Sequence, residues 1–279
     1  MFLKSFAKIN LTLNVINKKK NGLHDIQSIY CLINCYDKVT INVIKKSKKD
    51  RVIFKGPFSK NVKKTNNSVS KSLILLRKYK IIDKYYKIEI TKNIPVFAGL
   101  GGGTSNAATV FNFFIKKKIK EKFLNKITSF IGTDLRLFFI KQGYLVNFRT
   151  VIKFKKKFNL HFLVVFPLIK SSTKSVFSKV KKYSKRRMFV PIMIKSKREL
   201  VNYLINSKND LQSVVEKSHP KIRQLLFDIS KIRGCYLSRM TGSGSSCYGL
   251  FLNEKSSKVA LRKLRKKYPK FWFSIAKTI

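Results

Sequence analysis

The sequence predicts an α+β fold in two domains. Residues 8–15 alternate apolar and polar side chains, as a strand does, whereas residues 107–114 place apolar side chains three and four apart, as a helix does. The third observation is length, because 279 residues, 44% of them hydrophobic, suffice for one large or two modest domains with buried cores. A basic connector at 153–157 places the expected boundary near residue 157, between domains 1–157 and 158–279.

The opening strand has two faces. Ile9, Leu11, Leu13 and Val15 form the apolar face, and Lys8, Asn10, Thr12 and Asn14 form the polar face. The apolar face is expected to enter the core. For Thr12 and Asn14 the preferred interpretation is exposure to solvent.

The remaining elements follow from the same two periodicities. Val69, Leu73 and Leu76 stand in helical register, so we expect a helix there. β-Branched and aromatic runs bounded by polar turns predict the strands. The predicted helices cover residues 67–79, 107–114 and 261–268, and the predicted strands cover 29–44, 51–54, 86–91, 161–169, 235–237, 248–252 and 271–275.

The net charge raises a second class of function. Formal charge is +50, and an excess of Lys and Arg is what nucleic-acid-binding proteins use against phosphate backbones. The basic residues are spread over the whole chain, however, and the abundance of Lys, Asn, Ile, Phe and Tyr is what an adenine- and thymine-rich genome encodes. We expect no physiological nucleic-acid partner, and a basic nucleic-acid-binding protein is kept as the alternative from a different class.

Cysteine spacing and hydropathy further limit the classes of protein to which this chain could belong. The four Cys include no Cys-x-x-Cys pair, and the three His stand apart from them, so neither a zinc site nor a disulfide framework is indicated. Lys4 and Lys8 interrupt the N-terminal apolar residues, and no apolar run is long enough to span a bilayer. The expectation is a cytoplasmic protein without a membrane segment.

A glycine cluster is the strongest local signal. Four of the 12 Gly occupy positions 99–103, and a helical pattern follows with Thr104, Ser105 or Asn106 able to cap it. Glycines let backbone N–H groups converge on an anion, and a helix N-terminus adds donors and a favourable dipole. A phosphate loop is therefore predicted, with a flexible glycine-rich connector as the alternative. The expected contacts are Pro95, Val96, Phe97, Ala98, Gly99, Leu100, Gly101, Gly102, Gly103, Thr104 and Ser105.

This loop is neither of two common types. A Walker A loop ends in Gly-Lys-Ser/Thr, and a dinucleotide fingerprint needs Gly where Thr104 stands. Pro-x-x-x-Gly-Leu-Gly-Gly-Gly-Thr-Ser-Asn-Ala-Ala, at 95–108, instead resembles the nucleotide loop of the galactokinase, homoserine kinase, mevalonate kinase and phosphomevalonate kinase (GHMP) superfamily.

The resemblance implies a two-domain GHMP kinase fold. Its N-terminal domain is like domain 2 of ribosomal protein S5, its C-terminal domain is a ferredoxin-like α/β sandwich, and the active site lies in the cleft between them. ATP would place its phosphates over residues 99–105, and Mg²⁺ would have Thr104 or Ser105 as a candidate ligand. Gly102→Val is expected to abolish ATP binding while leaving the fold largely intact, because its side chain would fill the phosphate space and oppose a positive φ.

Two further motifs imply the chemistry. Lys8-Ile9-Asn10 resembles the superfamily's opening strand, which implies that Lys8 faces the transferred phosphoryl group and Asn10 the acceptor. Gly132-Thr133-Asp134 resembles Gly-Ala-Asp, with Arg136 in place of the family's Pro, so Asp134 would be the catalytic carboxylate. From the residues alone, the alternative is that Asp134 caps a helix or forms a structural ion pair.

A turn and a second loop imply the substrate. Gly22-Leu23-His24 resembles the Gly-Tyr-His turn of superfamily members that phosphorylate a cytidine diphosphate-linked methylerythritol in non-mevalonate isoprenoid synthesis. His24 would contact the cytosine, and Leu23 replaces the Tyr that helps enclose it. Residues 241–247 resemble a second glycine loop of the active cleft. The runner-up is another small-molecule kinase of the superfamily, of the homoserine or mevalonate type. Oligomeric state is left open.

Overall fold

The computed structural model describes residues 2–20, 22–115, 119–187 and 194–279, and the chain divides into two compact units. The first unit holds Met1–Ala7, Cys35–Val96 and Gly101–Ile140. The second holds Lys8–Asn34, Phe97–Leu100 and Lys141–Ile279. The boundary at residue 157 between two fold domains stays a prediction.

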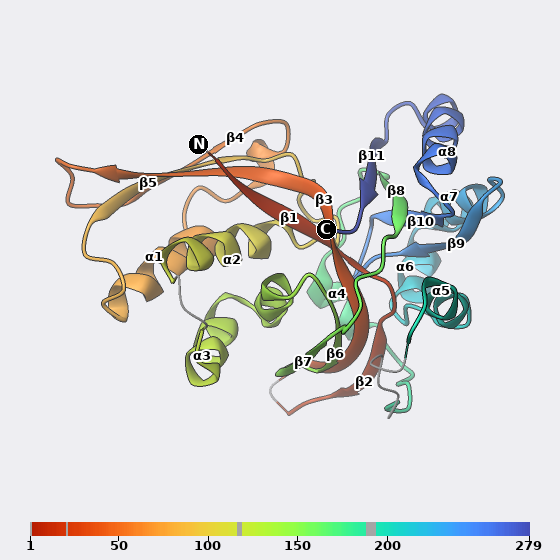
Figure 1. Cartoon of the computed structure of the whole chain (residues 1–279), viewed down its shortest axis with the longest axis horizontal. Coiled ribbons are helices and arrows are strands. Elements are labelled where there is room, and N and C mark those ends of the chain that lie inside the picture. Colours follow the sequence, from red (N-terminus) through yellow and green to blue (C-terminus); the bar gives the residue numbers. More distant parts are fainter. Residues whose placement is uncertain (1, 21, 116–118, 188–193) are drawn as a thin grey trace. The chain divides into compact units, whose positions relative to one another are not determined.

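Strands and helices alternate irregularly along the chain (Figure 1). The strands are β1 (Leu3–Asn10), β2 (Asn14–Lys18), β3 (His24–Ile44), β4 (Arg51–Lys55), β5 (Tyr85–Thr91), β6 (Gln142–Asn147), β7 (Thr150–Lys153), β8 (His161–Phe166), β9 (Cys235–Met240), β10 (Cys247–Phe251) and β11 (Trp272–Lys277). The helices are α1 (Ser68–Lys78), α2 (Gly102–Phe114), α3 (Glu121–Ile131), α4 (Thr173–Ser178), α5 (Lys197–Ile205), α6 (Gln212–Ser218), α7 (Pro220–Ser230) and α8 (Glu254–Lys267), with 3₁₀ turns η1 (Ser59–Asn61) and η2 (Thr133–Phe139).

The first unit combines a mixed sheet with helices. β5 pairs in parallel with β4 and antiparallel with residues 38–44 of β3. Helix α1 packs against α2 and α3. Its predicted apolar stripe, Val69, Leu73 and Leu76, is buried, and the Asn67 side chain caps it by accepting hydrogen bonds from two backbone N–H groups. The helix predicted over 67–79 is thereby confirmed.

The second unit is built around an antiparallel sheet of order β11-β8-β10-β9. Helix α7 packs on β9 and β10, and α8 packs on β8 and β11. The core between them includes apolar side chains from both ends of the chain: Leu13, Val15, Leu163, Val165, Leu225, Ile229, Ala260 and Leu264. Residues 24–31 of β3 pair with β2 and β6, and β6 pairs with β7.

This mixture of helices and sheets confirms the predicted α+β class, but three local expectations were wrong. Helix α8 begins at Glu254 rather than Leu261, because its first five residues, 254–258, are polar and carry no apolar signal. The opening strand is interrupted between Asn10 and Asn14. Thr12 and Asn14 are buried rather than exposed, because Thr12 Oγ1 accepts the Ile29 N–H at 2.9 Å and Asn14 pairs with Gln27 of β3.

Among the described residues, none of the helices is both long and apolar enough to cross a lipid bilayer.

Candidate active site

The loop predicted to bind phosphate leads directly into helix α2, which belongs to the first unit. Gly101 is the N-cap residue and has left-handed backbone angles, φ 69° and ψ 19°. The first intrahelical bond runs from Ser105 N–H to Gly101 O at 2.9 Å. The N–H groups of Gly102, Gly103 and Thr104 belong to the first turn, where helix geometry leaves them without an intrahelical acceptor. These donors and the helix dipole make the turn a site for an anion.

The expectation that a side chain of Thr104, Ser105 or Asn106 caps helix α2 was wrong. Helix α2 begins two residues before Thr104, so Thr104, Ser105 and Asn106 are all helical, and α2 has no side-chain cap hydrogen bond among the described residues. Ser105 is buried, accepts a hydrogen bond from Ser5 Oγ at 2.9 Å and donates to Phe6 O at 2.6 Å. Gly103 is exposed and Thr104 half-buried. The two candidate metal ligands therefore differ in exposure, and of the two, Thr104 has the more accessible side chain.

Gly102 has a different role from the one predicted. Its φ is not positive, unlike the φ values of Gly99 and Gly101. A Cβ at Gly102 would lie 3.0 Å from Ile94 Cγ2 and 3.2 Å from Lys92 Nζ, inside the first unit. A Cβ at Gly103 would meet only Ser68 Oγ, at 3.8 Å. The absence of a side chain at Gly102 thus allows α2 to pack closely against Lys92 and Ile94. At Gly103 it leaves open space on the exposed side of the helix start.

In the second unit, residues 97–100 lie against the second glycine loop, 241–247. Ser246 N–H donates to Ala98 O at 3.1 Å. A Cβ at Gly99 would lie 2.5 Å from Thr241 O, and one at Gly242 would lie 3.1 Å from Gly99 O. Both glycines also have positive φ, so the two loops contact each other closely only because these residues are Gly. The second glycine loop thus contacts residues 97–100 directly, and its place in an active cleft stays a prediction.

Lys8 and Asn10 lie at the end of β1, beside the second loop. Lys8 is 4% exposed, and its Nζ donates a hydrogen bond to Asn10 Oδ1. Asn10 in turn donates from Nδ2 to Ser28 Oγ at 2.8 Å and from its backbone N–H to Thr241 Oγ1 at 2.9 Å. The Lys8 backbone N–H donates to Leu100 O at 3.0 Å. These bonds hold the Lys8 ammonium next to the residues that precede α2.

His24, at the start of β3, lies half-buried in the second unit. Its ring lies against that of Phe177 on α4, with centroids 4.9 Å apart and planes tilted by 32°. Its strand partner is Lys18 of β2. Burial, and next the positive charge of Lys18, lower the pKa of His24 below 6.5. The imidazole is therefore neutral near pH 7, with one ring nitrogen able to donate and the other to accept. Leu23 beside it is 47% exposed.

Asp134 belongs to the first unit, where it lies half-buried in the first turn of η2. Gly132 is the N-cap residue of that turn, so the alternative that Asp134 caps a helix was wrong. Arg136 is 5% exposed, and its guanidinium donates to Glu121 Oε1 at 3.1 Å and to Asn125 Oδ1 at 2.8 Å on α3. The residue that replaces the family's Pro is thus bound to a neighbouring helix.

Sequence reasoning missed several residues that shape these surfaces. Phe177 gave no signal, because the stretch around it is mostly polar and basic. Arg239 is buried and donates to the carbonyl oxygens of Leu11, Leu204 and Ser207 at 2.6–2.8 Å, and its place on a strand beside a glycine loop could have indicated it. Asn209 donates from Nδ2 to Met240 O and Gly242 O, both at 2.8 Å, and so holds the second loop. Within the part of the chain that the structure describes, no group of three or more His, Cys, Asp and Glu could hold a metal ion.

Two family models match this chain. Residues 67–131 match the model of the GHMP kinases N-terminal domain, and residues 193–270 match that of the GHMP kinases C-terminal domain. The first match contains α1, α2 and α3, and the second contains the loop 241–247.

Curated relatives match over nearly the full length. A 4-diphosphocytidyl-2-C-methyl-D-erythritol kinase of Pelagibacter ubique is 38% identical over 99% of this chain and 98% of its own. The kinase of the same name from Wolbachia pipientis is 32% identical over 97% and 96%. A crystal structure of 4-(cytidine 5'-diphospho)-2C-methyl-D-erythritol kinase shares the fold, with a TM-score of 0.74 at 20% identity and 99% coverage of both chains. A mevalonate kinase structure has a TM-score of 0.63 at 17% identity, over 100% of this chain and 99% of its own. The chain therefore belongs to the GHMP kinases and, within them, to the 4-diphosphocytidyl-2-C-methyl-D-erythritol kinase family.

Proposed function

We propose that this protein transfers the γ-phosphoryl group of ATP to the 2-hydroxyl of 4-diphosphocytidyl-2-C-methyl-D-erythritol, a step of non-mevalonate isoprenoid precursor synthesis. The names of full-length relatives support this reaction. The structural observation that carries the proposal is the start of α2, where a left-handed Gly101 is followed by an exposed Gly103. First-turn N–H groups lie there without a side chain at Gly103 to cover them, which suits the phosphates of a nucleotide.

Residues 95–105 would make the nucleotide site. Gly101, Gly103 and Thr104 offer the phosphate contacts, because they form the open side of the helix start. Gly102 supports that turn from inside the first unit. Pro95 and Val96 lead into the loop, and the exposed Phe97 ring offers an apolar surface.

Asp134 and Lys8 would carry the transfer. As the bond forms between the acceptor oxygen and phosphorus, the bond from phosphorus to the bridging oxygen of ADP breaks, and the hydroxyl proton passes to the Asp134 carboxylate. The Lys8 ammonium would offset negative charge on the moving group. Asn10 acts through Lys8, because its amide oxygen accepts the Lys8 hydrogen bond and its Nδ2 is bonded to Ser28.

Thr104 fits a magnesium site better than Ser105. A Mg²⁺ ion bound with the nucleotide would neutralise phosphate charge. The Thr104 side chain is half-buried at the start of α2, whereas the Ser105 hydroxyl is buried and already bonded to Ser5 and Phe6. We therefore assign the candidate contact to Thr104 alone.

His24 would recognise the cytosine. A neutral imidazole can donate to an acceptor on the pyrimidine edge or accept from its amino group, and Phe177 supplies an aromatic face next to it. Phe177 can contribute an aromatic contact to the cytosine, which the aliphatic side chain of Leu23 cannot provide. This assignment is what separates the proposed substrate from the homoserine or mevalonate of the runner-up kinases.

The test is a coupled assay of ADP release with purified protein. Turnover is expected with 4-diphosphocytidyl-2-C-methyl-D-erythritol and at background level with homoserine or mevalonate. Turnover with one of the latter and none with the cytidine compound would replace this proposal by the runner-up. A filter-binding salt titration with RNA tests the other alternative: binding that persists at physiological salt would support it. We further propose a cytoplasmic location.

A further inference from the structure

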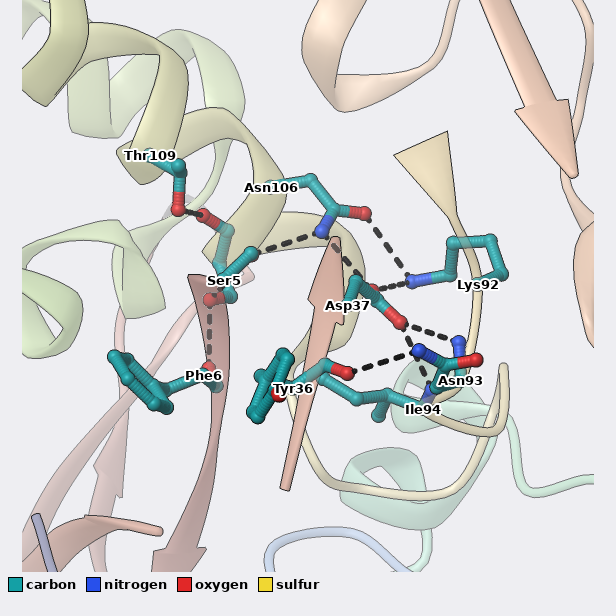
Figure 2. Close-up of polar contacts among 10 residues, drawn as sticks. Ser5, Phe6, Tyr36, Asp37, Lys92, Asn93, Ile94, Asn106 and Thr109 are labelled. Carbon is teal, nitrogen blue, oxygen red and sulfur yellow. Dashed lines mark hydrogen bonds and ion pairs between the residues drawn. The ribbon is translucent and has the colours of Figure 1, made fainter. Parts of the chain in front are cut away.

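A buried polar network lies beneath the start of α2 in the first unit, and the reaction above does not use it. Its centre is the ion pair between Lys92, which follows β5, and Asp37 on β3 (Figure 2). Lys92 is 2% exposed, and Asp37 and Asn106 of α2 are equally inaccessible. This set, Asp37, Lys92 and Asn106, is called the α2 anchor below.

The Asp37 carboxylate joins its own strand, β3, to two other segments of the chain. One oxygen, Oδ1, accepts the backbone N–H groups of Asn93 at 2.7 Å and Ile94 at 2.8 Å. The other, Oδ2, accepts from Lys92 Nζ and from Asn106 Nδ2, the latter at 3.0 Å. One carboxylate therefore holds the segment that leads into the phosphate loop and the second turn of the helix that follows it.

Asn106 extends the contacts on the helix side. Its Oδ1 accepts from Lys92 Nζ at 3.2 Å, and its Nδ2 also donates to Ser5 Oγ on β1 at 2.8 Å. Ser5 Oγ donates to Ser105 Oγ, one residue before Asn106. Lys92 Nζ lies 3.2 Å from the position a Cβ would take at Gly102, so the ammonium lies directly under the first turn of α2.

Stability alone gives no reason for this arrangement. Withdrawing two charges from water costs about as much as their attraction returns, and apolar residues of similar volume often stabilise a buried site as well or better. Burial lowers the pKa of Lys92, because it disfavours the charged ammonium, whereas the neighbouring Asp37 carboxylate raises it. Burial and the ion pair thus act on Lys92 in opposite directions. Charged and amide groups form directional hydrogen bonds, which apolar side chains cannot form. Each of these hydrogen bonds fixes the position of one chain segment relative to another.

We propose that Asp37, Lys92 and Asn106 are positioning residues that hold the phosphate loop and the first turn of α2 in their ATP-binding geometry before ATP arrives. The inference rests on the proposed role of residues 95–105 in binding ATP. A preformed loop gains affinity because ordering it costs nothing at the moment of binding. The α2 anchor acts on the nucleotide only through the loop, so it should affect ATP much more than the acceptor.

The test variant is Asp37→Asn/Lys92→Met, which removes both charges together. The amide introduced at position 37 retains an oxygen for the two backbone N–H groups, and the thioether introduced at position 92 keeps most of the lysine volume, so neither partner is left as an unpaired buried charge. The matched control is Asp50→Asn/Arg77→Met. It removes the Arg77–Asp50 ion pair of the same unit, 3.0 Å long, which joins α1 to the turn before β4.

Three measurements distinguish a positioning role from a general effect on stability. Direct calorimetric titration with ATP, well below both melting temperatures, should show the dissociation constant rising about 10- to 100-fold in the anchor variant and less than twofold in the control. Hydrogen exchange without nucleotide should be faster at residues 98–106 of the anchor variant and unchanged over α1. In steady-state assays, KM for the acceptor should stay within about twofold.

The result that overturns the proposal is an ATP dissociation constant within twofold of the parent, whatever the melting temperature does. A parent protein that binds no ATP overturns it as well. Titration with ATP needs no acceptor, so failure of the proposed acceptor appears separately, as ATP binding without turnover. If the anchor variant does not fold, Asn106→Ser, which removes only the helix side of the network, is titrated instead, with the same expected rise and the same overturning result.

Discussion

The His24 imidazole lies against the Phe177 phenyl ring, with centroids 4.9 Å apart and ring planes tilted by 32°. The two residues are more than 150 positions apart in the sequence, on β3 and α4 of the second unit. This contact restricts how the imidazole can rotate, and it leads to two predictions, one on substrate affinity and one on pH.

Phe177→Ala should weaken binding of the cytidine substrate without weakening that of ATP. Aromatic pairs contribute about 0.5–1.5 kcal/mol beyond their buried area, so KM for the cytidine substrate should rise about 2- to 10-fold. His24→Ala should raise it further, because the hydrogen bond to the base is lost as well. Phe177→Tyr keeps the ring and is the control. Equal rises in KM for both substrates would show that the ring pair is only structural.

The lowered pKa of His24 predicts a loss of stability in acid. The folded-state pKa lies below the ordinary value of 6.5, so the unfolded chain takes up this proton more readily. The contribution is fully present above about pH 6.5 and is lost as pH falls through the folded-state pKa. Between pH 7.5 and 5.5, the parent should therefore lose more unfolding free energy than His24→Gln does. His161, whose pKa is also lowered, is common to both proteins. Parallel pH profiles in urea denaturation would contradict this.

Gly103→Ala should separate stability from nucleotide binding. A Cβ there meets only Ser68 Oγ at an ordinary 3.8 Å, and Ala is about 1 kcal/mol better than Gly inside a helix, so the melting temperature should hold or rise. ATP binding should nevertheless weaken, because the methyl group covers the first-turn donors. Gly102→Ala is the comparison: its Cβ would press on Ile94 at 3.0 Å and should lower the melting temperature. If Gly103→Ala binds ATP as the parent does, the phosphates do not lie over this turn.

Asp134→Asn should lower kcat by about 10²–10⁴ while ATP binding changes little, because the base is removed and the shape is kept. Lys8→Ala should have an effect of similar size. If the two act on one step, the double variant will be far less impaired than the product of the single losses. Turnover is measured per folded, ATP-binding molecule. Near-parent turnover of Asp134→Asn would remove that carboxylate from the mechanism.

Local patterns sufficed for most elements and for the glycine-rich turn at the start of α2. The stripe of Val69, Leu73 and Leu76 predicted α1, and the glycine cluster before a helical repeat predicted the loop and α2. The N-cap was mispredicted because Ser and Thr usually provide it, whereas here the left-handed Gly101 starts the helix. That choice depends on backbone angles, which no side-chain pattern encodes.

The missed residues act through partners distant in sequence. Alternation over 8–15 predicted one continuous strand with a polar face open to solvent. It could not show that the strand breaks after Asn10, or that the polar side chains are covered, because Thr12 is bonded to Ile29 of another strand. Phe177 and Arg239 contact His24 and Leu11, and neither pairing leaves a periodic trace. Asp37 and Lys92 likewise meet across 55 positions.

The interleaving of the two compact units has a consequence for how the protein is made. Leu13 and Val15 emerge early from a ribosome, yet their core partners on β8, α7 and α8 lie between residues 161 and 267. At about 5–20 residues per second, these side chains wait on the order of 10–50 s for those partners. A chain cut at residue 157 would separate them permanently. Expressed alone, residues 158–279 would expose the apolar surface that Leu13 and Val15 cover, and we expect such a fragment to aggregate unless it is produced together with residues 1–157.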